Sequence, residues 1–171
     1  LCQVLDITPE KLRVIVPDMG GGFGSRGGVY AEYPVLLAVA KEFGRPVRWT
    51  ATRSESMLTD TQARDHDTKA ELALDRDGNF LALRIRADWR HGAYLPSRSV
   101  WVTLHYLPPT IGGTYRLAEA DIGIRGIFTN STPQSAYRGV GRAEGNYLLE
   151  SLIDAAAREM RLDPIELRRR N

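Results

Sequence analysis

Cysteine is almost absent from this chain, and its scarcity excludes several kinds of site. Cys2 is the single cysteine among 171 residues, so no internal disulfide can form. Zinc and iron–sulfur centres need paired cysteines or cysteine–histidine clusters, and His66, His91 and His105 lack the spacing of metal ligands. We therefore assign no metal ligand, and one unpaired thiol favours a reducing, cytoplasmic location.

Long apolar runs and an excess of one charge are also lacking. No stretch of about 18 apolar residues occurs, and the first residues lack the basic start and apolar stretch of a signal peptide. The 23 basic and 21 acidic side chains leave a net charge of +2. We therefore expect neither a membrane nor a nucleic-acid partner. A start at Leu1 without an initiator Met suggests a fragment.

Hydrophobic spacing predicts an α+β fold. Strands are expected at residues 12–16 and 47–51, paired in parallel, and a mostly buried helix from Tyr30 to Phe43 that stops at Gly44. Thr52 is expected to cap one helical turn. The strongest pattern, residues 68–87, alternates on both sides of an Asp77-Gly78 turn and predicts a β-hairpin.

The C-terminal half adds one strand and two helices to this prediction. Residues 122–128 are expected to form a strand, and residues 148–160 a helix, whereas residues 89–117 keep neither period for long. Asp163 can cap a last helix that begins at Pro164. The prediction is a mixed sheet with a β-hairpin, packed on one side by two main helices, residues 30–43 and 148–160.

A glycine-rich loop, residues 20–28, follows the first predicted strand and precedes a predicted helix, so its amides could converge on an anion. Gly22-x-Gly24-x-x-Gly27 matches the dinucleotide pattern G-x-G-x-x-G, but Thr52-Arg53 stands where an acidic residue would be expected. No Gly-Lys-Ser/Thr follows, which argues against a nucleotide hydrolase. A merely tight connection is an equal alternative.

A second glycine-bearing loop, residues 135–144, precedes the helix at 148–160. Arg138 and Arg142 could bind a phosphate or carboxylate through their planar donor forks, or could pair with Glu144 or Glu150. Residue types alone do not separate these alternatives. Both glutamates are expected near a helix start, where the helix dipole stabilises a carboxylate.

Gly20-Gly21-Gly22-Phe23-Gly24 and Ala136-Tyr137-Arg138-Gly139-Val140-Gly141 resemble the two molybdenum-site loops of the xanthine dehydrogenase/aldehyde oxidase family. The likeness covers nearly the whole chain, including residues 44–48, 52–57, 77–78 and 163–171. It implies that residues 1–171 are a fragment of the first molybdopterin-cofactor-binding domain of a large subunit. Such a fragment would be inactive alone.

The resemblance also implies a cofactor, partners and site residues. The cofactor would be molybdopterin with molybdenum, as the cytosine dinucleotide in bacterial members, and oxygen from water would enter the substrate. Cofactor-binding residues would be Gly22, Phe23, Gly24, Ser25, Ala136, Tyr137, Arg138 and Gly139. Partners would be the remaining large-subunit domains, iron–sulfur and flavin subunits or domains, and a small-molecule substrate, with self-association of the isolated chain also expected.

Two departures from the family pattern restrict this implication. Carbon monoxide dehydrogenases carry a copper-binding cysteine in the second loop, and this chain has none there, so aldehydes or N-heterocycles are the expected substrates. The family's catalytic glutamate belongs to a later region, so no residue here is assigned as catalytic. A nucleotide-binding α/β module and a structural or assembly domain without cofactor remain the alternatives.

Overall fold

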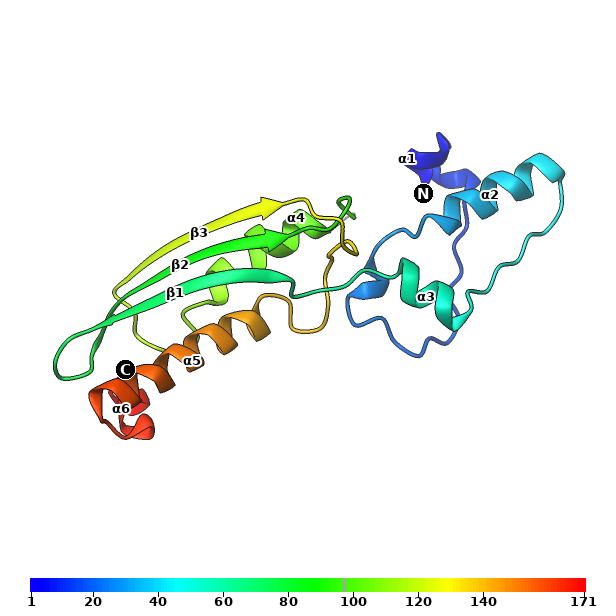
Figure 1. Cartoon of the computed structure of the whole chain (residues 1–171). Coiled ribbons are helices and arrows are strands. Elements are labelled where there is room, and N and C mark those ends of the chain that lie inside the picture. The colour runs from blue at the N-terminus through cyan, green and yellow to red at the C-terminus, as the bar shows by residue number, and fades with distance from the viewer. Residues whose placement is uncertain (97) are drawn as a thin grey trace. The chain divides into compact units, whose positions relative to one another are not determined.

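The computed structural model of the chain describes residues 1–96 and 98–171 (Figure 1). They form two compact units, Leu1–Asp60 and Thr61–Asn171. In the described part of the chain, no helix is both long and apolar enough to span a bilayer.

The second unit is built on a mixed three-stranded sheet of β1 (His66–Leu74), β2 (Phe80–Arg90) and β3 (Glu119–Ile127). The central strand β2 pairs antiparallel with β1 and parallel with β3 (Figure 1). In this register Ala70, Ile85 and Ile122 lie side by side across the sheet. The predicted hairpin and the predicted strand near residue 122 are therefore confirmed.

The hairpin turns through Asp75 to Asn79. One carboxylate oxygen of Asp75 accepts hydrogen bonds from the Asp77 and Asn79 backbone amides, both at 2.9 Å, while the other accepts from the Asn79 side chain at 2.7 Å. These bonds, with the Asn79 side chain first, hold the pKa of Asp75 below its ordinary value. Gly78 supplies the positive φ, +86°, that the turn requires.

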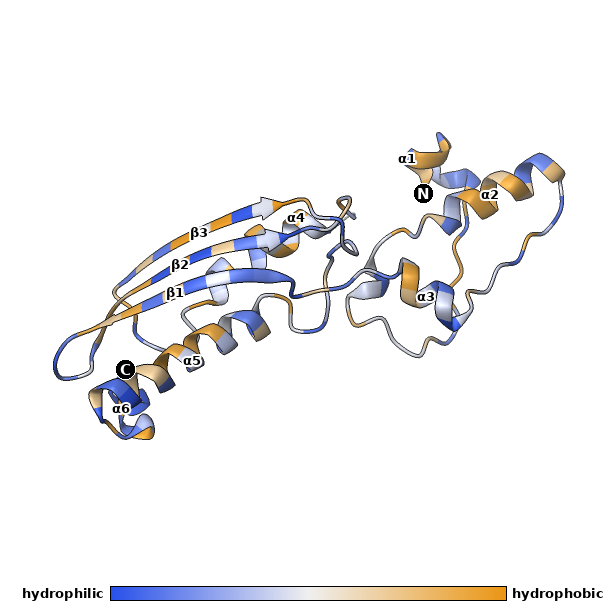
Figure 2. Cartoon of the chain, viewed as in Figure 1, coloured by the Kyte–Doolittle hydropathy of each residue, from blue (hydrophilic) through white to orange (hydrophobic). Residues whose placement is uncertain are grey.

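Alternation along the strands gives the sheet one apolar and one charged face, and Figure 2 shows this alternation of polar and apolar residues. Leu83, Ile85, Ala87 and Trp89 of β2 are buried. The opposite face carries cross-strand ion pairs, among them Arg86–Asp121 at 2.6 Å and Arg125–Asp88 at 2.7 Å.

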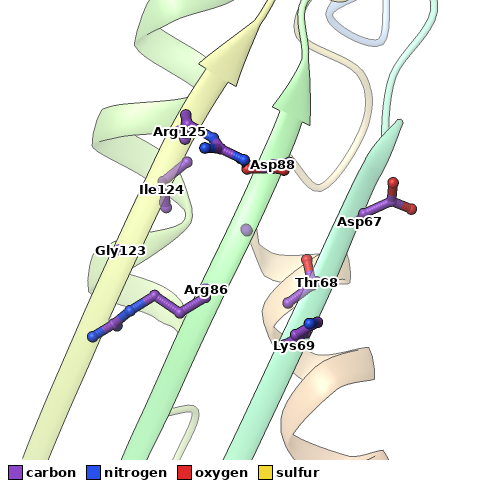
Figure 3. Close-up of a pocket in the computed structure, with 9 residues that line it drawn as sticks. Asp67, Thr68, Lys69, Arg86, Asp88, Gly123, Ile124 and Arg125 are labelled. Carbon is purple, nitrogen blue, oxygen red and sulfur yellow. Dashed lines mark hydrogen bonds and ion pairs between the residues drawn. The ribbon is translucent and has the colours of Figure 1, made fainter.

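This charged face contains a shallow pocket above Gly123, shown in Figure 3. Arg86 reaches over Gly123, where a Cβ atom would lie 3.0 Å from the Arg86 Cδ. Arg125 pairs with Asp88 inside this pocket, and Arg86 pairs with the neighbouring Asp121. Exposed pairs of this kind contribute little stability. Because neither predicted glycine loop lines the pocket, we do not assign the cofactor to it.

Helical segments cover the apolar face of the sheet. The long helix α5 (Arg142–Met160) packs on β1, and η3 (Val102–Tyr106), a π-helical turn between α4 (Ser99–Trp101) and η4 (Pro108–Thr110), packs on β3. The predicted helix at residues 148–160 is confirmed and begins six residues earlier. The core comprises Phe80, Leu83, Ile85, Ala87, Trp89, Val102, Leu107, Ile111, Leu149, Ile153, Ala157 and Leu167.

The last helix, α6 (Pro164–Arg170), begins as predicted. The Asp163 carboxylate accepts hydrogen bonds from the amides of Ile165 and Glu166, which are two of the unpaired donors at a helix start. Asn171 then ties this end to the hairpin: its Oδ1 accepts from the Phe80 amide at 2.7 Å, and its Nδ2 donates to the Gly78 carbonyl at 2.9 Å.

The first unit is helical. It contains α1 (Cys2–Leu5), η1 (Pro9–Lys11), η2 (Ser25–Gly27), α2 (Glu32–Phe43) and α3 (Arg53–Thr59). As predicted, α2 ends at Gly44, which adopts φ +60°. The predicted Thr52 cap is also confirmed, because Thr52 and Glu55 form a reciprocal capping box.

Two strand predictions in this unit are wrong. Residues 12–16 and 47–51 form no strand, and Val14 and Ile15 are 65% and 70% exposed. A strand needs the N–H and C=O groups of a neighbour, and no described segment of this unit supplies them. Helix α2 was expected to be mostly buried, yet none of its residues is. Helix α2 belongs to the first unit, and the sheet belongs to the second. Within the second unit, α5 and η3 pack on the sheet.

The core predicts a contrast between two isoleucines. Ile153 of α5 is fully buried, whereas Ile165 of α6 is 58% exposed. Ile153→Ala should lower the free energy of unfolding by about 2 to 5 kcal/mol through lost burial and a cavity, while Ile165→Ala should cost less than about 1 kcal/mol. Urea denaturation of both variants measures the difference, and equal losses would contradict the core described here.

Candidate functional site

The first loop, residues 20–28, has an unusual backbone around Phe23. Phe23 adopts φ +48°, a backbone conformation that residues other than glycine seldom adopt, and the residue is 59% exposed. Two nearby glycines also have positive φ, +135° at Gly21 and +98° at Gly24. A Cβ at Gly21 would lie 2.6 Å from the Phe23 ring, so a side chain there would displace the ring from its present position.

Local hydrogen bonds hold this loop. The Ser25 hydroxyl donates to the Gly22 carbonyl at 3.2 Å, and the amide of Gly27 donates to the Gly24 carbonyl at 3.0 Å. These bonds form the short turn η2, whereas α2 begins later, at Glu32. The glycines therefore lead into η2, and residues 29–31 separate the last glycine, Gly28, from α2.

An ion pair fixes the turn after the glycines. The Arg26 guanidinium contacts both carboxylate oxygens of Asp60 at 3.2 Å and lies 5.1 Å from the centre of the Tyr30 ring. The Tyr30 hydroxyl donates to the same carboxylate at 2.8 Å. Burial, followed by this carboxylate, raises the pKa of the Tyr30 hydroxyl. Residues 25–30 are thus anchored to the end of α3.

The second loop, residues 135–141, leads straight into α5. Tyr137, Arg138 and Gly139 are exposed, and Gly139 adopts φ +83°. The Gly139 carbonyl accepts the amides of Arg142 and Ala143, at 2.8 and 3.1 Å, so the loop itself satisfies part of the helix start. Gly141 has φ +74° and lies against the backbone of Tyr106.

Arg64 reaches this loop from 74 residues away in the sequence. Its guanidinium donates to the Arg138 carbonyl and lies 5.3 Å from the centre of the Tyr137 ring. The Nε atom of Arg64 is 3.8 Å from Glu144 Oε1. Arg64, Tyr137, Arg138 and Glu144 are called the Arg64 cluster below.

The two glutamates weighed as partners of Arg138 and Arg142 pair with other arginines. Glu144 pairs with Arg64, and Glu150 pairs with Arg168 at 2.7 Å while accepting the Tyr115 hydroxyl, also at 2.7 Å. Glu150 lies well inside α5, so its predicted place near the helix start is wrong. Glu144 lies in the first turn of α5, as predicted. Its Oε2 atom, however, is buried and has no hydrogen-bond partner among the described residues.

A buried hydrogen-bond network holds Gln134, the residue that precedes the second loop. The indole N–H of Trp89 donates to the Gln134 side-chain oxygen at 2.8 Å, and the Gln134 amide nitrogen donates to the Asp65 carbonyl at 2.5 Å. The Gln134 backbone amide donates to the His91 backbone carbonyl at 3.0 Å. His66 stacks on Trp89 with ring centres 4.8 Å apart.

Sequence reasoning missed Arg64 and Gln134. Gln134 directly precedes the predicted loop, and a polar residue between Pro133 and Ser135 gave only a weak signal. No local pattern marks Arg64, because its role depends on a contact distant in sequence. The eight predicted site residues form two sets, Gly22 to Ser25 in the first unit and Ala136 to Gly139 in the second.

The whole chain, residues 1–171, matches the family model described as the molybdopterin cofactor-binding domain. It is 34% identical over its full length to subunit gamma of the 6-hydroxypseudooxynicotine dehydrogenase complex of Paenarthrobacter nicotinovorans, and spans 21% of that protein. Among solved structures, quinoline 2-oxidoreductase from Pseudomonas putida 86 is 39% identical with a TM-score of 0.85, over 91% of this chain and 20% of that one.

Carbon monoxide dehydrogenase from Oligotropha carboxidovorans superposes with a TM-score of 0.89 at 31% identity, over 99% of this chain and 21% of that one. The chain thus spans about a fifth of the length of the relatives it matches. With a family model that matches every residue and a fold shared with these enzymes, the chain belongs to the molybdopterin cofactor-binding domain family. The predicted family is therefore confirmed.

The second loop predicts different tolerance at its two glycines. An alanine Cβ at Gly141 would lie 2.5 Å from the Tyr106 carbonyl carbon, whereas at Gly139 the nearest atoms are 3.8 Å away. Gly139→Ala should cost about 1 to 2 kcal/mol from its positive φ alone. Gly141→Ala should cost about 3 kcal/mol or more, because overpacking adds to the strain. Urea denaturation measures both, and a Gly141→Ala variant no weaker than Gly139→Ala would contradict this contact.

His66 predicts a pH dependence of stability. Burial lowers its pKa from the ordinary 6.5, outweighing the nearby carboxylates of Glu144, Asp65 and Asp67. A lowered folded-state pKa means that the unfolded state binds the proton first, so stability falls as the pH drops below about 6.5. His66→Phe keeps a ring against Trp89 and removes this titration. Lowering the pH from 7.5 to about 5 should therefore reduce the free energy of unfolding more in the wild type than in His66→Phe. Identical pH profiles of the two proteins would refute the effect assigned to His66. The pKa of His91 is also lowered by burial, but His91 is present in both proteins and does not contribute to the difference.

Proposed function

We propose that this chain supplies two loops of the molybdenum-cofactor site in a hydroxylase that oxidises an N-heterocycle or an aldehyde with oxygen from water. The second loop carries the proposal: an exposed Tyr137-Arg138-Gly139 segment at the start of α5, held by Arg64 and preceded by the buried Gln134. An exposed segment held this firmly is typical of a binding loop on a rigid scaffold.

The residues present fit a phosphate-bearing cofactor with an oxo-rich metal. Arg64, Arg138 and Arg142 gather around the positive end of the 19-residue helix α5, with Glu144 as the one carboxylate of the Arg64 cluster. At Gly139 a side chain would meet nothing closer than 3.8 Å, so the backbone is open to a ligand. In the first loop, strained backbone at Phe23 is of the kind that accumulates at functional sites.

Each residue set would have its own role. The bound cofactor would supply redox chemistry at molybdenum. Backbone amides of Gly24 and Gly139 would donate to its oxygen atoms, since preorganised amide donors cost no reorganisation. Arg138 would bind a phosphate or carboxylate through its planar guanidinium. The exposed ring of Phe23 would shield one side of the site from water.

Substrate, cofactor form and partners extend this proposal. The 39% identity to quinoline 2-oxidoreductase favours an N-heterocycle, and Gly139 occupies the loop where a copper-binding cysteine would be expected. We assign molybdopterin cytosine dinucleotide as the cofactor and the cytoplasm as the location. The proposed partners are the remaining domains of a large subunit and iron–sulfur and flavin subunits. Exposed Val14 and Ile15 suit such contacts, or self-association of the isolated chain.

Two glycines of the first loop provide the test in the complete subunit. Gly24→Val places a branched side chain at φ +98°, beside Phe23, and should abolish hydroxylation and lower bound molybdenum. Gly20→Val is the matched control, because nothing lies within 4 Å of its Cβ position and its φ is not positive. Molybdenum and pterin content are measured together with turnover. Full cofactor and unchanged turnover in Gly24→Val would reject this loop as part of the site.

A further inference from the structure

Arg64 combines backbone strain with two side-chain contacts to the second loop and a third to Glu144 of α5. It adopts φ +66°, a conformation rarely occupied by residues with side chains, so its surroundings must hold it there. Backbone bonds provide the hold: Gln62 donates to the Pro133 carbonyl at 3.0 Å, and Ser135 donates to the Gln62 carbonyl at 2.9 Å. The segment that carries Arg64 is therefore fastened to the base of the second loop.

The guanidinium of Arg64 fixes one peptide of that loop. It donates to the Arg138 carbonyl while the Tyr137 ring lies beneath it. The C=O and N–H of a planar trans peptide point in opposite directions. Holding the Arg138 carbonyl toward Arg64 therefore turns the Gly139 N–H away from Arg64. Gly139 has no side chain and could otherwise rotate this peptide at little cost.

Glu144 sets the orientation of Arg64. Its side chain is 3% exposed, and only Oε1 approaches a cation, Arg64 Nε at 3.8 Å, while Oε2 has no partner among the described residues. A buried carboxylate with so few hydrogen bonds is costly to fold around. The outer face of the sheet contains exposed ion pairs without this cost, such as Arg125–Asp88. Stability alone does not explain Glu144.

We infer that Arg64 is a positioning residue, held by Glu144, that orients the Arg138–Gly139 peptide and thereby aims the Gly139 N–H at the bound cofactor. The inference rests on the proposed function for the aim of this donor. The fixed peptide itself belongs to the chain whether or not cofactor is bound.

The first experiment needs no cofactor. Amide hydrogen exchange of residues 137–141 is compared in the cofactor-free wild type, in Arg64→Met, which keeps the stem and removes every donor, and in Glu144→Gln, which keeps the shape and removes the charge. Exchange in both variants should quicken by about tenfold or more as local opening becomes easier. Arg125→Met, which breaks an exposed ion pair, is the matched control and should leave this segment unchanged. Unchanged exchange in Arg64→Met would overturn the inference.

The second experiment uses the complete, cofactor-loaded subunit. Arg64→Met should retain molybdenum, lower kcat by about tenfold or more with KM nearly constant, and shift the electron paramagnetic resonance signal of the metal. Arg64→Lys should restore part of kcat, because an ammonium can still donate to the Arg138 carbonyl. An unchanged signal and kcat, with faster exchange, would reduce Arg64 to a purely structural role. A wild-type subunit without molybdenum would instead refute the proposed function, while the exchange result still decides whether the peptide is fixed.

Discussion

The hydrogen bond from the Trp89 indole to Gln134 is the interaction on which the second unit's site depends. Trp89 is the last of the buried side chains along β2. Gln134, which accepts its indole N–H, also donates to the carbonyls of Asp65 and His91. Through this bond the sheet positions both segments that meet at the second loop, the one bearing Arg64 and the one bearing Arg138. Both the oxygen and the nitrogen of this buried side-chain amide are hydrogen-bonded, and leaving either without a partner would be costly, so the network favours one arrangement of the loop.

Two kinds of charge interaction coexist in this unit, and their surroundings separate their roles. On the outer face of the sheet, the pairs of Arg86 and Arg125 lie in water, where screening makes them nearly neutral for stability. Inside, Glu144 meets a single arginine at long range and leaves one oxygen without a partner. The exposed pairs keep the sheet edge and face soluble. The pair of Arg64 with the buried Glu144 instead favours one geometry of the second loop, at some expense of stability.

The sequence predicted the features whose causes are local. The Asp77-Gly78 turn, the Thr52 and Asp163 caps and the Gly44 stop each depend on neighbouring residues, and each is present. Residues 12–16 and 47–51 were predicted wrongly, because an apolar pattern indicates burial but does not provide the neighbouring strand. Both glycine loops were recognised from composition and resemblance. The residues that hold the second loop were not, since Arg64–Arg138 and Trp89–Gln134 join positions 74 and 45 residues apart.

Asn171 joins the end of α6 to the hairpin. Its side chain bonds to Phe80 and Gly78, and its carbonyl accepts the Arg116 amide at 2.8 Å. The hairpin turn is held by residues of the hairpin itself, Asp75 and Asn79 among them. The first amide of β2, in contrast, has its partner 91 residues later in the sequence. Pairing at this end of the sheet is therefore a long-range contact, and contacts of this kind slow folding because a long loop must close first.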